Sequence, residues 1–242
     1  MSTPDDREEM VVHTMEVTFA SLMIGKGLDY DTKELLKLGL AALLENIGMY
    51  KIADSVINKT GKLEKREIAI IKRHPEVSAE ILSRMGERYA WLAETALQTH
   101  ERSDGSGYPR GLHGDEISEM ASIIGLVDVY VAMIKKRPYR AKLIQTDAIK
   151  FIVKEARGLF PNTILKMFLD QISLFPVNTH VTLNNKFIGR VISTDKTHPL
   201  KPIIELLYDG QGKKLARRKV VRLADNPLIH IVKSLSEKEL PS

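Results

Sequence analysis

The spacing of apolar residues changes once along this chain of 242 residues, near Phe175 and Pro176. Before that point apolar residues recur every three or four positions, the spacing of one helix face. The clearest example runs through Leu35, Leu36, Leu38, Leu43, Leu44 and Ile47. After it, short β-type runs over 179–183, 187–194 and 203–208 are separated by turn residues. The pattern predicts a mainly α chain, a helical bundle followed by a small C-terminal β module.

Helix signals and turn residues set the predicted boundaries. Asp31 and Glu34 form a capping-box pattern, and Gly48 is a stop signal, so one helix is expected over 34–47. Further helices are expected over 9–25, 64–73, 75–85, 87–101, 117–136, 146–157 and 162–174. The predicted domains are a helical domain over 1–176, a β module over 177–225 and a weakly anchored tail over 226–242.

Composition excludes several classes of protein. The chain has no cysteine, so any metal site must use His, Asp and Glu, a donor set suited to iron or manganese. No apolar run approaches the ~18 residues of a membrane helix, and the amino terminus is polar and acidic. We therefore expect no membrane segment and a cytoplasmic location.

The net charge of +5 lies in the C-terminal part, where 177–242 holds 12 Lys and Arg against 6 Asp and Glu. Its basic cluster is Lys213, Lys214, Arg217, Arg218 and Lys219. A nucleic-acid contact is one interpretation of this cluster. A solvated hairpin is favoured, because no aromatic-rich RNA-binding pattern accompanies it. Nucleic acid is therefore not an expected partner.

Polar residues with metal-binding chemistry recur at predicted helix ends and faces. Glu9 and His13 are four residues apart, on one face of a helix, and Asp128 lies within the helix predicted over 117–136. Glu45 with Asn46, His74 and His100 stand at helix ends, which can converge in a bundle. Each residue alone is as simply a cap or a solvated group; together they indicate a present or former metal site.

The segment from Thr99 to Pro109, followed by Asp128 and by Arg137-Pro138-Tyr139-Arg140, resembles the HD-GYP family of metal-dependent cyclic-dinucleotide phosphodiesterases. The resemblance covers roughly residues 5–160 and implies an HD-type helical bundle. It also implies metal ligands at Glu9, His13, Glu45, His74, His100 and Asp128. No catalytic residue is assigned from the sequence.

Several positions depart from the family pattern. The His-Asp dyad of the family is Glu45-Asn46 here, and its His-His pair is Thr99-His100. Met49 stands where the family has Lys, and Val131 where an acid is usual. A neutral amide is a poor bridge between two cations, so fewer divalent ions than in the family, or none, are expected.

The recognition residues of the family are retained. The resemblance implies that the loop with Asp104, Gly105, Gly107, Tyr108 and Pro109 contacts a ligand or a signalling-protein partner. Arg137 and Arg140 offer two guanidinium groups suited to phosphate or guanine, although a surface ion pair is the simpler alternative. Cyclic di-GMP or a related cyclic dinucleotide is the implied ligand.

Three functions remain open on the sequence. The favoured one is a degenerate HD-GYP protein, a regulatory or ligand-binding module of cyclic di-GMP signalling with impaired hydrolysis. The second is an active metal-dependent phosphodiesterase with an altered ligand set, in which Glu45 takes the place of histidine. The third is a nucleic-acid-associated protein that acts through its basic β module.

Overall fold

The computed structural model describes residues 4–57, 59, 61–135, 145–172, 175–194, 201–235 and 239–241. The chain forms two compact units. The helical unit comprises Met1–Lys142 and Phe151–Gln171, and the β unit comprises Leu143–Lys150 and Ile172–Ser242. The predicted fold class, mainly α with a small C-terminal β module, is confirmed.

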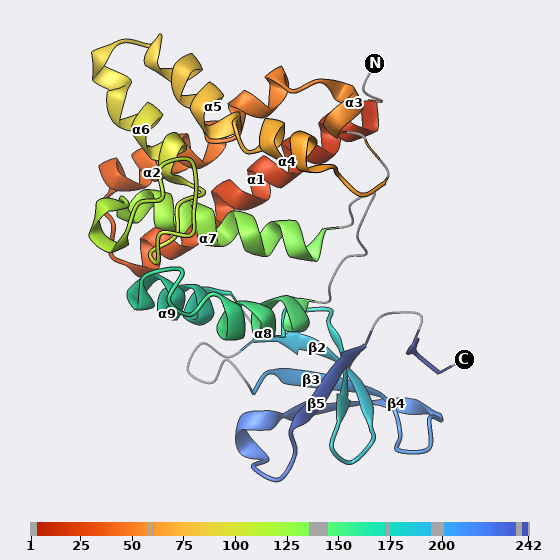
Figure 1. The fold of residues 1–242 in the computed structure, drawn as a ribbon. Helices are drawn as coiled ribbons and strands as arrows, with labels where there is room; N and C mark the ends of the chain where they lie inside the picture. Colours follow the sequence, from red (N-terminus) through yellow and green to blue (C-terminus); the bar gives the residue numbers. More distant parts are fainter. Residues whose placement is uncertain are drawn as a thin grey trace. The chain divides into compact units, whose positions relative to one another are not determined.

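The helices follow one another through the first part of the chain (Figure 1). They are α1 (Pro4–Gly27), α2 (Thr32–Leu44), α3 (Asp54–Ile57), α4 (Lys65–Ile71), α5 (His74–Ser83), α6 (Ala90–Gln98), α7 (Glu119–Ile134), α8 (Gln145–Glu155) and α9 (Asn162–Gln171). Short 3-10 turns cover Ile47–Lys51, Glu87–Tyr89, Gly114–Glu116 and Leu223–Asp225. No described helix is long and apolar enough to cross a membrane.

The start of α2 is as predicted, but its end is not. The Asp31 side chain accepts a hydrogen bond from Glu34 N at 2.8 Å, and Asp31 N donates to the Glu34 side chain at 2.8 Å. The helix ends at Leu44, and Gly48 lies within the 3-10 turn that follows. A Cβ on Gly48 would lie 2.3 Å from the His74 carbonyl oxygen. This glycine therefore permits close backbone packing and does not stop the helix.

The core of the helical unit is apolar and centres on α7. This helix packs against α1 and α6, and α5 packs against α6. Ten of its residues are buried, in agreement with a helix whose apolar residues surround it on all sides. The fully buried large side chains of this core include Ile123, Ile124 and Leu126 of α7 itself. Those contributed by other helices include Ile24, Leu38, Leu82, Leu92, Ile164 and Phe168.

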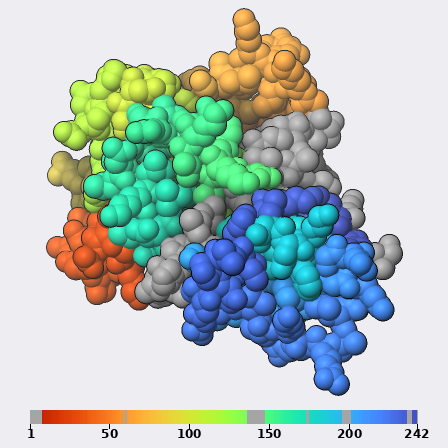
Figure 2. Space-filling model, turned by 90° about the horizontal axis from the view of Figure 1, so that it is seen from below, coloured from red at the N-terminus to blue at the C-terminus, as the bar shows by residue number. Residues whose placement is uncertain are grey.

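The β unit contains a five-stranded antiparallel sheet in the order β4-β3-β2-β1-β5. Its strands are β1 (His180–Leu183), β2 (Ile188–Ser193), β3 (Ile203–Tyr208), β4 (Lys214–Arg222) and β5 (Ile231–Leu235). The first three match the predicted runs. One face buries Val181, Leu183, Val191, Ile204, Leu206 and Leu223. The strands of this unit are drawn in cyan and blue in Figure 2.

The basic segment is part of a solvated hairpin, as predicted: it forms strand β4, paired with β3 from Ile203↔Arg222 to Tyr208↔Lys214, and seven of its nine residues are exposed. One prediction about the C-terminal part was wrong. The tail expected over 226–242 contains β5, which pairs with β1 through His180↔Leu235. Neither segment shows clear apolar–polar alternation, because each lies at a sheet edge and exposes residues on both faces.

We expect Gly125→Ala to destabilise the protein by about 1–3 kcal/mol, because overpacking forces backbone shifts. A Cβ on Gly125 of α7 would lie 2.2 Å from the Thr99 carbonyl oxygen. Gly61→Ala is the matched control, since nothing lies within 4 Å of its added Cβ. Urea unfolding followed by circular dichroism measures both; equal stability of the two variants would contradict the prediction.

Candidate functional site

An imidazole–carboxylate pair joins α1 to α7. Nε2 of His13 lies 2.8 Å from Oδ1 of Asp128, although the residues are 115 positions apart in the chain. Both side chains are largely buried, with 12% and 14% exposed. The structure therefore brings together two of the predicted ligand positions.

Two histidines meet where α5 begins and α6 ends. Nε2 of His74 lies 2.9 Å from Nε2 of His100. Nδ1 of His74 donates to the Ile71 carbonyl oxygen at 2.8 Å, so Nε2 of His74 is the acceptor in the contact with His100. Burial lowers the pKa of His74, and it lowers the pKa of His100 to about 3. Both imidazoles are neutral at neutral pH.

Glu45 follows the last residue of α2 and is buried, with 1% exposed. The Asn46 side-chain amide donates to Glu45 Oε1 at 2.7 Å. The buried Oε2 atom has no hydrogen-bond partner among the described residues. The nearby Thr99 hydroxyl lowers the Glu45 pKa slightly. Its hydrogen is donated to the Ala96 carbonyl oxygen at 3.1 Å. Burial, followed by the Asp128 charge, holds the pKa of Glu45 well above its usual range.

The remaining predicted ligand, Glu9, is exposed on α1, and no polar contact described for the chain joins it to His13. Within the described ranges, no group of three or more His, Asp and Glu side chains is arranged to hold a metal ion. The arrangement of pairs does not fit the two- or three-metal set that the family resemblance implies.

The other departures from the family pattern lie on structural positions. Met49 is within the 3-10 turn after α2, and Val131 is buried in α7. Thr99 is also buried, and its hydroxyl donates a hydrogen bond to the Ala96 carbonyl oxygen of α6. None of these three side chains supplies a charged group to the site.

The glycine-rich loop after His100 is held by the buried carboxylate of Glu101. Its Oε1 accepts from Arg110 N at 2.7 Å, and its Oε2 accepts from Leu112 N at 3.0 Å. A Cβ on Gly107 would lie 2.4 Å from Glu101 Cα, so the loop backbone passes directly over this residue. Sequence analysis missed Glu101, although it directly follows His100.

Within the loop, the predicted recognition residues make internal contacts. Asp104 Oδ1 accepts from Ser106 N at 3.0 Å and from the Ser106 hydroxyl at 2.7 Å. Gly105 has a φ of +78°, and its absent Cβ leaves room for the His113 ring. Pro109 follows Tyr108 through a cis peptide bond. The loop is therefore an ordered element with its own hydrogen bonds.

Tyr108 rests on the histidine pair. Its ring stacks on His100 with a centroid distance of 5.0 Å and an interplanar angle of 3°, and its backbone N donates to the His100 carbonyl oxygen at 3.1 Å. Nζ of Lys72 lies 4.8 Å from the Tyr108 ring centroid. Burial raises the pKa of Tyr108 to about 12. The loop thus presents a neutral phenol beside His100, and Lys72, at the end of α4, adds an ammonium group over its ring.

Arg102 is a second residue that sequence analysis missed, and it is partly buried. Nη1 donates to the carbonyl oxygens of Thr99 and Glu101 at 3.2 and 2.6 Å, and the guanidinium lies 4.7 Å from the Phe160 ring centroid. Burial lowers its pKa, and the charge of Asp128 opposes that shift. Arg102 therefore holds the end of α6 and adds positive charge near Asp128.

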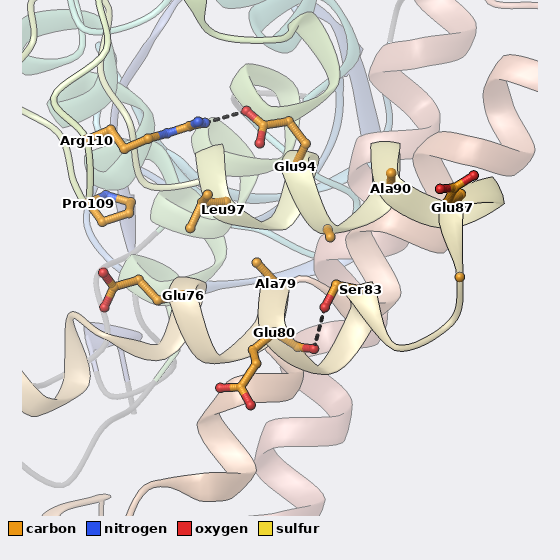
Figure 3. Close-up of a pocket in the computed structure, with 12 residues that line it drawn as sticks. Glu76, Ala79, Glu80, Ser83, Glu87, Ala90, Glu94, Leu97, Pro109 and Arg110 are labelled. Atoms are coloured by element: carbon orange, nitrogen blue, oxygen red, sulfur yellow. Dashed lines mark hydrogen bonds and ion pairs between the residues drawn. The ribbon is translucent and has the colours of Figure 1, made fainter.

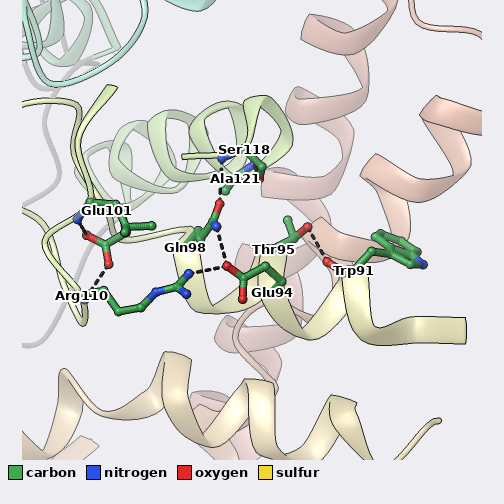
Figure 4. Close-up of polar contacts among 9 residues, drawn as sticks. Trp91, Glu94, Thr95, Gln98, Glu101, Arg110, Ser118 and Ala121 are labelled. Carbon is green, nitrogen blue, oxygen red and sulfur yellow. Dashed lines mark hydrogen bonds and ion pairs between the residues drawn. The ribbon is translucent and has the colours of Figure 1, made fainter. Parts of the chain in front are cut away.

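A polar network ties the loop to α6 and α7 (Figure 4). Gln98 accepts from Ser118 N at 2.7 Å and donates to Glu94 at 2.6 Å, while Arg110 donates to the same carboxylate. Ser118 is also the N-cap of α7 and accepts from Ala121 N. These contacts fix the start of the helix that carries Asp128.

A groove of about 730 Å³ lies between α5 and α6 beside the loop (Figure 3). Its wall includes small residues and four glutamates. The lining residues are Glu76, Ala79, Glu80, Ser83, Gly86, Glu87, Ala90, Ala93, Glu94, Leu97, Pro109 and Arg110. None of the paired His, Glu or Asp residues of the site lines it. Arg137 and Arg140, predicted to bind phosphate, lie outside the described residues.

Comparison with protein families identifies the helical unit. The HD domain family matches residues 5–163, more than half of the chain. The chain belongs to the HD domain family. The predicted HD-GYP resemblance is confirmed. A second family, described as a KOW domain associated with HD domain, matches residues 180–242 and covers the strands of the β unit.

Similar proteins of this HD family include two cyclic di-GMP phosphodiesterases. PA4108 of Pseudomonas aeruginosa is 29% identical over 216 residues, which cover 89% of this chain and 52% of that protein. PdeB of Borreliella burgdorferi is 27% identical over 231 residues, which cover 95% of this chain and 61% of that protein. The chain thus spans between half and two thirds of the length of these relatives.

A solved structure supports the fold assignment. Bd1817, an HDG"Y"P protein from Bdellovibrio bacteriovorus, superposes with a TM-score of 0.55 at 19% identity. The match covers 66% of this chain and 51% of that one. At this identity the likeness concerns the fold.

We expect the free energy of unfolding of the Glu45→Gln variant to rise relative to that of the unchanged protein as the pH rises. A carboxyl whose folded pKa is raised is fully stabilising below its unfolded pKa, and that stability is lost as the pH rises toward the folded pKa. The substituted amide has no proton to lose, so the difference grows by up to about 1.4 kcal/mol per pH unit in this window. Urea unfolding at pH 5 and 8 measures it; a difference independent of pH would contradict it.

Glu101→Ala should destabilise the protein by about 2–4 kcal/mol, since two backbone N–H groups lose their acceptor in a buried site. Glu94→Ala is the control, because Glu94 is about half exposed and its ion pair with Arg110 is worth under about 1 kcal/mol. Thermal unfolding compares the two variants. Equal losses would show that the Glu101 carboxylate does not hold the loop.

Proposed function

We propose that this chain is a ligand-binding, regulatory HD-GYP module of cyclic di-GMP signalling in which phosphodiester hydrolysis is impaired. The HD domain match and the names of the two relatives support the ligand class. The ordered loop through Tyr108 supports a retained recognition surface. The Glu45–Asn46 pair supports the loss of hydrolysis.

The hydrogen bond between Asn46 and Glu45 carries this proposal. In the HD-GYP family the equivalent dyad supplies a bridging carboxylate, and hydrolysis depends on cations that activate water and neutralise the phosphate. Here the amide of Asn46 donates to Glu45 at 2.7 Å, so it turns its hydrogens toward a neighbouring carboxyl. Glu45 is itself buried with a raised pKa, which favours its neutral form.

The side chains of both pairs in the site, His74 with His100 and His13 with Asp128, already have partners within the protein. His74 and His100 are neutral and contact each other, and Asp128 is paired with His13. Neither pair leaves a carboxylate free to act as a base toward water. The arrangement is suited to a packed interior more than to proton transfer.

Ligand binding is assigned to the surface around Tyr108. A cyclic dinucleotide carries two phosphates and flat bases, which cations and stacked rings recognise. Lys72 lies over the Tyr108 ring, and the loop ends near Arg110. Arg137 and Arg140 complete the proposed set as phosphate ligands. The same loop is the proposed contact for a signalling-protein partner.

The alternative is an active phosphodiesterase with an altered set of iron or manganese ligands. One observation favours it: the charge of Asp128 influences the pKa of Glu45, His74 and His100, so these groups interact electrostatically with it. A metal-dependent enzyme would need these side chains to converge on one ion. Hydrolysis assays separate the two functions.

We expect the purified protein to bind cyclic di-GMP without cleaving it. Under anaerobic conditions with iron(II) or manganese(II), its rate should equal that of a His74→Ala control. Calorimetry should detect binding that weakens at least about tenfold in Arg137→Ala/Arg140→Ala. Lys135→Ala is the control for charge, because Lys135 is paired with Glu16 at 3.0 Å.

Two results would contradict this assignment. Metal-dependent turnover that vanishes in His74→Ala would establish the active phosphodiesterase. Failure to bind cyclic di-GMP, with no turnover, would remove the ligand from the proposal.

A further inference from the structure

Strand β4 stands at one end of the sheet order, and no described strand pairs with its outer edge. Its pairing with β3 is regular over 219–222 and shifts register between Leu206 and Tyr208. All but two of its nine residues are exposed. Unpaired N–H and C=O groups along a strand edge are a template for another strand.

A cavity of about 600 Å³ adjoins β4. Four consecutive β4 residues, Lys219 to Arg222, line it. Side chains of consecutive strand residues point to opposite faces, so a space that touches all four reaches the strand backbone as well as its side chains. The other lining residues are Leu183, Asn185, Phe187, Ile203, Leu206, Asp225, Asn226 and Ile229. The cavity thus combines a strand edge with an apolar recess.

The edge is strongly basic. β4 carries Lys214, Arg217, Arg218, Lys219 and Arg222 and no acidic residue. Glu205 of β3 forms ion pairs with Arg218 and with Arg190, each at 2.8 Å. Two such edges from copies of this chain would place like charges opposite each other, which is unfavourable. The charge therefore selects an acidic occupant.

We propose that the β4 edge binds an acidic, extended segment of a partner protein as an added strand. Main-chain hydrogen bonds to 219–222 would supply register, and an apolar side chain of the segment would enter the recess near Phe187 and Ile229. Val220, 48% exposed, lies on the same edge and would be covered. Nucleic acid is disfavoured, because it has no alternating N–H and C=O groups with which to extend a sheet, and Phe187 is the one aromatic side chain among the described residues that line the cavity.

The test uses the full chain and a labelled synthetic peptide of about eight residues that alternates glutamate with valine. Fluorescence anisotropy at about 50 mM NaCl should detect binding, weakened at about 300 mM. Lys219→Glu/Arg222→Glu should raise the dissociation constant at least about tenfold. Lys65→Glu/Arg66→Glu, an equal charge change at exposed residues of α4, should leave it unchanged.

Loss of binding in a variant could result from misfolding, so a second measurement uses the protein without substitutions. Hydrogen exchange should slow at those amides of 219–222 that point away from β3 when the peptide is present. An N-methylated peptide that binds as well as the parent would show that the backbone edge is not used, and would overturn the proposal. Single-stranded RNA that binds more tightly than the peptide, or no peptide binding at low salt, would overturn it as well.

Discussion

The candidate site depends on two places where the backbone of one segment packs directly against the backbone of another, with a glycine at the contact. A Cβ on Gly125 would lie 2.2 Å from the Thr99 carbonyl oxygen, and one on Gly48 would lie 2.3 Å from that of His74. The first approach sets α7, with Asp128, against the end of α6. The second sets the segment after Glu45 against the start of α5. Two pairs of segments distant in sequence thus come into backbone contact because two glycines leave room.

Burial then decides the chemistry of the groups that meet. A low-dielectric interior disfavours charge, so it lowers the pKa of His100 and raises that of Glu45. A carboxylate among neutral groups is tolerated where a partner faces it, as Asp128 has in His13. The departure from the family at Glu45 and Asn46 fits this interior, since the pair satisfies one carboxyl oxygen internally. The helical unit is proposed to bind a cyclic dinucleotide, and the β unit an acidic strand.

Much of the fold was predictable because it depends on local signals. The capping box at Asp31 and the apolar face of α2 are encoded within a few residues of each other. Strand β5 was missed because an edge strand buries little, and its pattern resembles that of a polar loop. The contact partners of Glu101 and Arg102 could not be predicted either, since their acceptors and donors come from loop backbone with no sequence signature.

The sequence by itself determined the helical bundle, the change to β structure and the HD-GYP residues, because periodicity and motif spacing are properties of the chain alone. Tertiary structure decided which candidate residues meet. It pairs His13 with Asp128 and His74 with His100, and it leaves Glu9 exposed. Helix packing over long separations selects these partners, and a residue's own neighbours in sequence carry no record of them.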